Sequence, residues 1–198
     1  MKQETTSYFK QLYDLLLGMQ VTDSQGTGLS LDEGASRAVA ILLSVASGSG
    51  KVMAIGNGGS AAIASHLQND LCNGAGIRTM DFSQVPLLTA LSNDLGYDHV
   101  FERPVELWAN AGDLMVAISS SGQSENILRA AQAAAKKGCQ IITLSGFSTD
   151  NPLRRLGEVN FYVPSPAYGL VESAHSTLAH FLTDCAALSQ ANKRNSSD

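Results

Sequence analysis

The sequence has little charge, few cysteines and no long apolar run, and each shortage excludes a class of protein. Charged residues make up 16% of the 198 residues and hydrophobic residues 44%, a balance that excludes an intrinsically disordered chain. The net charge is -5 and the 13 Lys and Arg residues form no cluster, which argues against a nucleic-acid-binding surface. An anionic ligand must therefore be held by local hydrogen-bond donors.

The three cysteines, Cys72, Cys139 and Cys185, are odd in number and far apart in the sequence. They form neither a disulfide framework nor a CxxC motif, so we expect reduced, mostly buried thiols. Residues 1–5 lack the apolar core of a signal peptide, and no apolar run reaches the length of a membrane span. These features predict a cytoplasmic protein without membrane contact.

The most informative stretch joins an apolar run to a helix-forming run through a serine-rich loop. Residues 114–118 are typical of a strand that is buried on both faces. Residues 125–137 are strong helix formers, followed by Gly138 as a helix-ending residue. Residues 119–124 therefore lie at a helix N-terminus, where free amides and the positive end of the helix dipole attract an anion. The loop predicts a phosphate site, with hydroxyl donors from Ser119, Ser120, Ser121 and Ser124.

A second strand–loop–helix unit comes earlier in the chain. Residues 51–55 predict a strand, residues 56–60 a glycine-rich loop and residues 61–71 a helix for which Ser60 is the expected N-cap. The loop is not a GxGxxG motif, and no lysine follows it as in a P-loop. Nucleotide binding is therefore not indicated.

The remaining periodicities predict further helices and strands that alternate along the chain. Helices are expected at 8–19, 30–45, 97–110, 152–156 and 170–188, and strands at 77–82, 140–144 and 159–163. Residues 21–28 are expected to form a loop, 93–96 a turn and 189–198 a frayed tail, while 86–91 fit either a short helical turn or an extended segment. This alternation predicts one α/β domain over residues 1–198, with a parallel sheet of about five strands and helices on both faces. Ligands then bind at the carboxyl ends of the strands.

Five motifs occur in an order that identifies a resemblance. Residues 56–62 with His66, 93–97, 112–114, 118–124 and the helix with Glu172, His175 and His180 together resemble proteins of the sugar isomerase (SIS) domain family. The chain looks most like the phosphoheptose isomerases, which interconvert sedoheptulose 7-phosphate and a manno-heptose 7-phosphate. The resemblance implies a flavodoxin-like three-layer sandwich. It also implies a homotetramer with active sites at subunit interfaces, and helices within residues 1–48 are expected at such an interface.

The resemblance also implies roles for individual residues. Contacts with the sugar phosphate are implied for Asn57, Gly58, Ser60, Asn93, Asp94, Ser119, Ser120, Ser121, Ser124 and Glu172. One divalent metal per subunit, typically zinc, is implied to bind His66, Asp70, Glu172 and His180, with Asp70 and His180 transferring protons. The chain departs from the family at Asp70 (usually glutamate), Glu172 (usually glutamine) and Gly169 (usually aspartate), and it lacks an arginine after the His66 helix.

Spacing supports part of this assignment. His66 and Asp70 are four residues apart and project from one helix face, which suits shared metal ligation or an acid–base pair. Glu172 and His180 are eight residues apart, about 12 Å along a straight helix, so spacing alone does not bring them to one ion.

The leading interpretation is a phosphosugar aldose–ketose isomerase that uses metal-assisted proton transfer through an enediolate. Two alternatives remain open at this point. One is a non-catalytic SIS protein that binds a sugar phosphate or serves as an adaptor for a replication initiator. The other is an isomerase of a different sugar phosphate.

Overall fold

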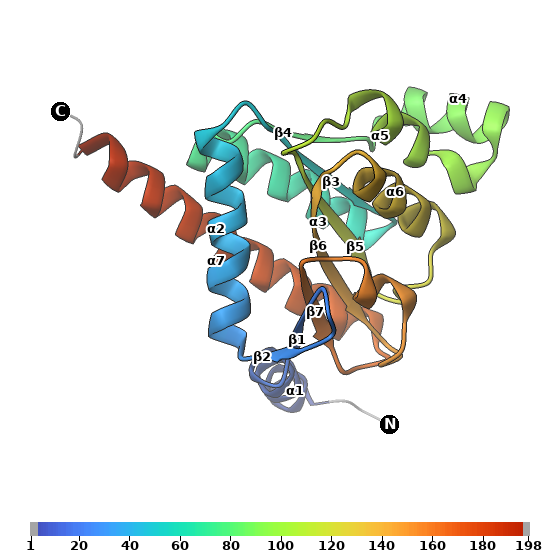
Figure 1. The fold of residues 1–198 in the computed structure, drawn as a ribbon. Helices are drawn as coiled ribbons and strands as arrows, with labels where there is room; N and C mark the ends of the chain where they lie inside the picture. Colours follow the sequence, from blue (N-terminus) through green and yellow to red (C-terminus); the bar gives the residue numbers. More distant parts are fainter. Residues whose placement is uncertain (1–3, 196–198) are drawn as a thin grey trace.

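A seven-stranded sheet with the order β2-β1-β7-β6-β5-β3-β4 lies at the centre of the computed structural model, which describes residues 4–195 (Figure 1). The strands are β1 (Gln20–Asp23), β2 (Gly28–Leu29), β3 (Val52–Gly56), β4 (Thr79–Asp81), β5 (Leu114–Ser119), β6 (Gln140–Gly146) and β7 (Val159–Val163). The five strands β3 to β7 are parallel. Counted along the chain, their spatial order is 2-1-3-4-5, which is the flavodoxin-like order. The predicted fold class is confirmed.

Helices cover both faces of the sheet. They are α1 (Thr5–Leu17), α2 (Leu31–Ser47), α3 (Gly59–Asp70), α4 (Val85–Leu95), α5 (Glu102–Trp108), α6 (Glu125–Lys136) and α7 (Tyr168–Asn195), with short helical turns η1 (Leu71–Ala75), η2 (Tyr97–His99) and η3 (Pro152–Arg155). Among the described residues, no helix combines the length and the apolarity needed to cross a bilayer.

The core lies in two layers because side chains alternate along the buried strands. Val116 and Ile118 of β5 belong to the layer beneath α2, α3 and α7. Met115 and Ala117 of the same strand belong to the layer beneath α5 and α6. Every residue of β5 is buried, as the unbroken apolar run of residues 114–118 predicts for most of the strand.

The first part of the chain adds two strands where a loop was expected. The predicted loop at 21–28 is wrong, since β1 pairs antiparallel with β7 and β2 pairs antiparallel with β1. Val21 is the buried residue of β1 and lies against Gly34 of α2, where a Cβ would collide with it. The next helix begins as predicted: Ser30 and Glu33 form a reciprocal capping box.

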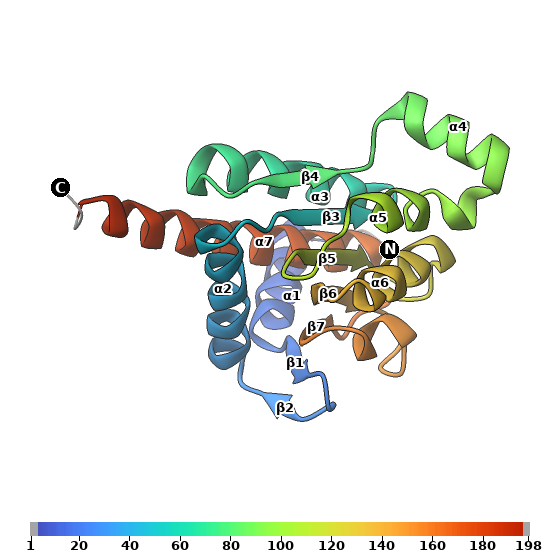
Figure 2. The same cartoon turned by 45° about the horizontal axis from the view of Figure 1, so that its top comes forward.

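Differences also occur on the opposite side of the sheet. The predicted turn at 93–96 is wrong, because α4 continues to Leu95 and ends at Gly96 with a φ of +87°. Pro86 lies in the first turn of α4, where proline is tolerated. Figure 2 shows α4 standing away from the sheet, in agreement with its lack of buried residues. The predicted helix at 97–110 is divided into η2 and α5.

Two helix boundaries correct the sequence-based prediction. Ser60 is not the N-cap of α3, because the helix begins at Gly59 and Gly58 is the cap. The predicted frayed tail is wrong for residues 189–195, which continue α7, and residues 196–198 lie outside the described residues.

Helices α3 and α7 pack side by side and run in the same direction. The first residue of α3, Gly59, lies against Glu172 near the start of α7. Further along, Asp70 contacts His180, and Gly74 lies beside Ala187. The N-termini of both helices therefore meet at the carboxyl edge of the sheet.

Candidate active site

A polar cavity lies where β3 and β5 end. Its lining combines residues of the two predicted loops with the start of α7: Asn57, Ser60, Ser119, Ser120, Ser121, Ser124, Tyr168 and Glu172. Seven of these eight residues were predicted to contact substrate, and Tyr168 was not. The Ser120 hydroxyl is buried and finds no hydrogen-bond partner among the described residues. A buried hydroxyl that lacks a hydrogen-bond partner and lies near a helix N-terminus is free to donate to a bound anion.

The serine loop is held by hydrogen bonds and by one buried asparagine. The Ser119 hydroxyl donates to the Ser124 hydroxyl at 3.3 Å and accepts from the Gly122 amide at 3.2 Å. Gly122 has a φ of +63°, and a Cβ at this position would collide with the Asn151 side chain. The Asn151 amide in turn donates to the Ser148 carbonyl at 2.8 Å. The loop after β6 therefore supports the loop after β5.

Asn57 is held by a pair of reciprocal amide hydrogen bonds. Its Nδ2 donates to Asn126 Oδ1, and Asn126 Nδ2 donates to Asn57 Oδ1, both at 3.0 Å. The Tyr97 hydroxyl also donates to Asn57 Oδ1, at 2.8 Å. Asn126 is buried in the first turn of α6, so this contact joins the glycine-rich loop to the helix that carries the serine loop. The sequence gives no local signal for this contact, because Asn57 and Asn126 lie 69 positions apart.

A cluster of titratable side chains lies further along α3 and α7. His66 Nε2 lies 3.4 Å and His180 Nδ1 lies 3.3 Å from Asp70 Oδ2. The two imidazole rings contact each other edge to face, with their centroids 4.9 Å apart. One ligand atom from each of the three residues lies within 4.8 Å of the others. Two imidazoles and a carboxylate at this separation suit a divalent cation such as zinc.

Glu172 lies outside this cluster, although it was predicted as a metal ligand. Its carboxylate lies against Gly59 at the N-terminus of α3 and lines the serine cavity. Along the helices, His66 is about 9 Å from Ser60, and His180 is about 12 Å from Glu172. The structure therefore divides the predicted site into the serine cavity, which includes Glu172, and the histidine–aspartate cluster.

Three predicted substrate contacts do not line the cavity. Gly58 is the exposed cap of α3, with a φ of +55°. Asn93 and Asp94 are exposed in the last turn of α4, where Asn93 Nδ2 donates to Asp94 Oδ1 at 2.9 Å. Asn93 instead lines a separate surface hollow with Tyr97.

His175 is fully buried, and its ring contacts the backbone of β6. Its Nε2 donates to the Ser145 carbonyl at 3.1 Å, and Nδ1 has no partner among residues 4–195. Burial lowers the pKa of His175 to about 4, so the ring is neutral at pH 7. It therefore holds the end of β6, after which the loop with Asn151 begins.

Comparison with known proteins gives one consistent family. The SIS domain profile matches residues 24–146. A phosphoheptose isomerase of Neisseria meningitidis is 34% identical over 169 residues, which are 81% of this chain and 86% of that protein. One of Helicobacter pylori is 33% identical over 162 residues, which are 79% of this chain and 84% of that protein.

Solved structures give the same result. The phosphoheptose isomerase of Neisseria gonorrhoeae superposes with a TM-score of 0.79 at 29% identity and covers 91% of this chain and 95% of that one. The phosphoheptose isomerase of Francisella tularensis also gives a TM-score of 0.79, at 26% identity and with the same coverage.

Proposed function

The chain belongs to the SIS domain family and is an isomerase related to the phosphoheptose isomerases, and we propose that it interconverts sedoheptulose 7-phosphate and the corresponding manno-heptose 7-phosphate. The observation that carries this proposal is a pair of polar sites: the serine cavity at the N-terminus of α6, and the histidine–aspartate cluster further along α3 and α7. The cavity suits the phosphate, and the cluster suits proton transfer at the opposite end of the sugar.

The separation of the two ends suits a seven-carbon substrate. In sedoheptulose 7-phosphate, seven bonds separate C2 from the phosphorus atom, about 8 Å at the advance of roughly 1.2 Å per bond of an extended chain. The cluster lies about 9 to 12 Å along the helices from the cavity residues Ser60 and Glu172. A shorter sugar phosphate would leave its carbonyl carbon further from Asp70 and His180.

Each group then has a chemical task. The serine hydroxyls and α6 amides hold the phosphate, which fixes the position of the sugar. Glu172 accepts hydrogen bonds from sugar hydroxyls. Of Asp70 and His180, one removes the proton from the carbon beside the carbonyl, and the other exchanges protons with the sugar oxygens. Their shared contact at 3.3 Å keeps base and acid within reach of one reacting unit.

We propose that His66, Asp70 and His180 hold one divalent metal ion, zinc, with Glu172 as a further ligand when side chains adjust around substrate. The donor types and their separation support this assignment. When bound, such an ion polarises the carbonyl and hydroxyl oxygens of the sugar.

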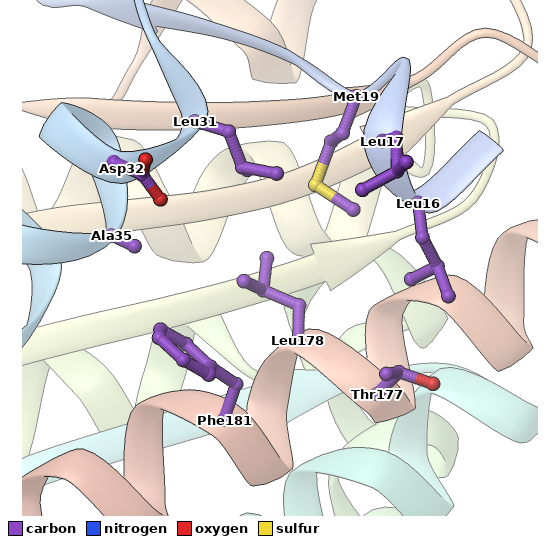
Figure 3. Close-up of a pocket in the computed structure, with 9 residues that line it drawn as sticks. All are labelled: Leu16, Leu17, Met19, Leu31, Asp32, Ala35, Thr177, Leu178 and Phe181. Carbon is purple, nitrogen blue, oxygen red and sulfur yellow. The ribbon is translucent and has the colours of Figure 1, made fainter. Parts of the chain in front are cut away.

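We also propose that the enzyme is a homotetramer with active sites at subunit interfaces. Phe9, Tyr13 and Leu17 form a stripe along α1 and are 62%, 60% and 63% exposed. Next to this stripe, α1, α2 and α7 enclose an apolar cavity of about 230 Å³, into which Leu178 and Phe181 project (Figure 3). A second copy of the chain would cover these surfaces. The three free cysteines support a cytoplasmic location.

The experiment that tests the function is an isomerase assay with sedoheptulose 7-phosphate, followed by NMR. We expect Asp70→Asn and His180→Ala to lower kcat by about 10²- to 10⁴-fold, the range for loss of an acid or base. Ser121→Ala is expected to raise KM instead. Asp184→Asn is the matched control, because Asp184 is an exposed carboxylate that lines one surface hollow together with Asp70 and His180. Full turnover by both the Asp70 and the His180 variants would contradict the mechanism.

Metal analysis of the same proteins tests the ligand assignment. We expect about one zinc ion per wild-type chain and loss of the ion from His66→Ala and His180→Ala. A wild-type protein that is free of metal and fully active would contradict this part of the proposal. No turnover on any heptulose or pentulose phosphate would favour the non-catalytic alternative.

A further inference from the structure

Tyr168 occupies a position in the cavity that no other described aromatic residue shares. It is the first residue of α7, and its side chain lines the cavity together with the serine loop and Glu172. Tyr168 and Glu172 are four residues apart, so both project from the same face of the helix. Tyr168 is 61% exposed, so a large amphipathic ring stands at the open side of a polar cavity.

The Tyr168 ring is held in place by a residue with an unusual backbone. Phe147 and Tyr168 pack edge to face, with ring centroids 4.7 Å apart and an interplanar angle of 78°. Phe147 has a φ of +59° and is the only non-glycine residue with positive φ in the described part of the chain. Two hydrogen bonds keep this conformation: the Phe147 amide donates to the Ser165 carbonyl at 3.1 Å, and the Tyr162 hydroxyl donates to the Phe147 carbonyl at 2.9 Å.

An unfavourable backbone conformation that is fixed from both sides indicates a local constraint on the Phe147 side chain. Glycine would adopt the same φ without strain, yet the chain has a phenylalanine whose ring touches a cavity residue. The strained position therefore places an aromatic support behind Tyr168.

We propose that Tyr168 is a specificity-determining residue whose ring packs against the carbon chain of the sugar phosphate, and that Phe147 is the positioning residue that holds this ring. The proposal rests on the proposed function, since it takes the serine loop as the phosphate site. A sugar phosphate presents hydroxyl groups and C–H groups. The Glu172 carboxylate accepts hydrogen bonds from hydroxyls, and the negative face of the Tyr168 ring attracts the C–H groups. Inorganic phosphate has no carbon chain and therefore gains nothing from Tyr168.

The test compares two ligands on the full-length protein by calorimetry. The ligands are inorganic phosphate and the alditol of sedoheptulose 7-phosphate, which has no carbonyl and does not react. We expect Tyr168→Ala to weaken alditol phosphate binding by about tenfold, the value of one well-placed aromatic contact. Binding of inorganic phosphate is expected to stay within twofold. Tyr168→Phe keeps the ring and should bind both ligands as the wild type does.

Phe147→Gly tests the positioning role without imposing backbone strain, because glycine suits a φ of +59°. We expect it to weaken alditol phosphate binding by a few-fold and to leave inorganic phosphate binding unchanged. The double variant with Tyr168→Ala should bind no more weakly than Tyr168→Ala alone, because Phe147 acts through the ring.

Several results would overturn the inference. They are alditol phosphate binding by Tyr168→Ala at wild-type strength, an equal loss of both ligands, a Tyr168→Phe variant as weak as Tyr168→Ala, or additive effects in the double variant. Failure of the proposed function gives a different result, in which the wild type binds the alditol phosphate more tightly than inorganic phosphate but isomerises no sugar phosphate. A wild type that binds neither ligand would refute the serine-loop assignment and the role of Tyr168 together.

Discussion

Replacing Asn126 with alanine tests whether the paired amides hold the two loops of the proposed phosphate site together. The substitution removes both reciprocal hydrogen bonds with Asn57 and leaves the Asn57 side chain with only the Tyr97 hydroxyl as a hydrogen-bond partner in the described chain. Each such bond contributes about 1 kcal/mol net. We therefore expect Asn126→Ala to lower the free energy of unfolding by about 2 kcal/mol.

The assay is a double-mutant cycle with Asn126→Ala, Asn57→Ala and the double variant. Urea unfolding is followed by circular dichroism at one protein concentration, because association between copies would change the apparent stability. The expected coupling free energy is about 2 kcal/mol, since either single substitution already breaks both bonds. Tyr97→Phe is the control, as it removes a different bond to Asn57 and should cost about 1 kcal/mol.

The same substitution should raise KM for the sugar phosphate, because Asn57 lines the cavity and would lose the contact that orients it. Independent effects of the two single substitutions, with a coupling free energy below about 0.5 kcal/mol, would refute the reasoning. So would an Asn126→Ala variant with wild-type stability and KM.

Two further predictions concern His175 and Gly122. His175 has a pKa of about 4 in the folded state against 6.5 as its ordinary value, so below pH 6.5 the unfolded chain binds a proton that the folded chain does not. The free energy of unfolding should therefore fall by about 3 kcal/mol as the pH drops from 6.5 to 4, and this loss is absent above pH 6.5. Urea unfolding at pH 7 and pH 4.5 should show a smaller drop in this free energy for His175→Gln than for the wild type. Equal drops would contradict the prediction. Gly122→Ala should cost about 3 kcal/mol of unfolding free energy, because it combines a positive φ with a collision against Asn151, and should weaken phosphate binding. Gly112→Ala, with a φ of +88° and open space around it, should show only the backbone cost of about 1 to 2 kcal/mol, so equal losses at the two glycines would argue against the Asn151 contact.

Most of the sheet could be predicted from sequence because its parallel strands are short, continuous apolar runs. The five predicted strands correspond to β3 through β7 with shifts of a few residues at their ends. β1 was not predictable in this way, since only Val21 of its four residues is buried. Its conformation depends on pairing with β7, in which Gln20 lies opposite Tyr162 far along the chain. Non-local pairing of this kind leaves no local signal.

The candidate site was predictable where its residues are consecutive and was missed where they meet only in space. The serine loop could be predicted because a buried strand, a hydroxyl-rich turn and a helix follow one another in the sequence. Tyr97, Asn126 and Tyr168 were missed, because each reaches the site through contacts with distant residues. The eight-residue spacing between Glu172 and His180 was itself a signal that the two side chains lie in different parts of the site.

The parallel packing of α3 and α7 has a consequence for how substrate preference changes in evolution. Ser60 and Glu172 of the cavity and the residues of the histidine–aspartate cluster are carried by these same two helices, so the helix rise of about 1.5 Å per residue sets the distance between them. Insertions in loops outside α3 and α7 leave that distance unchanged. Selection for a longer or shorter sugar can therefore act on this pair of helices only through the lengths of their side chains, while their backbone stays the same.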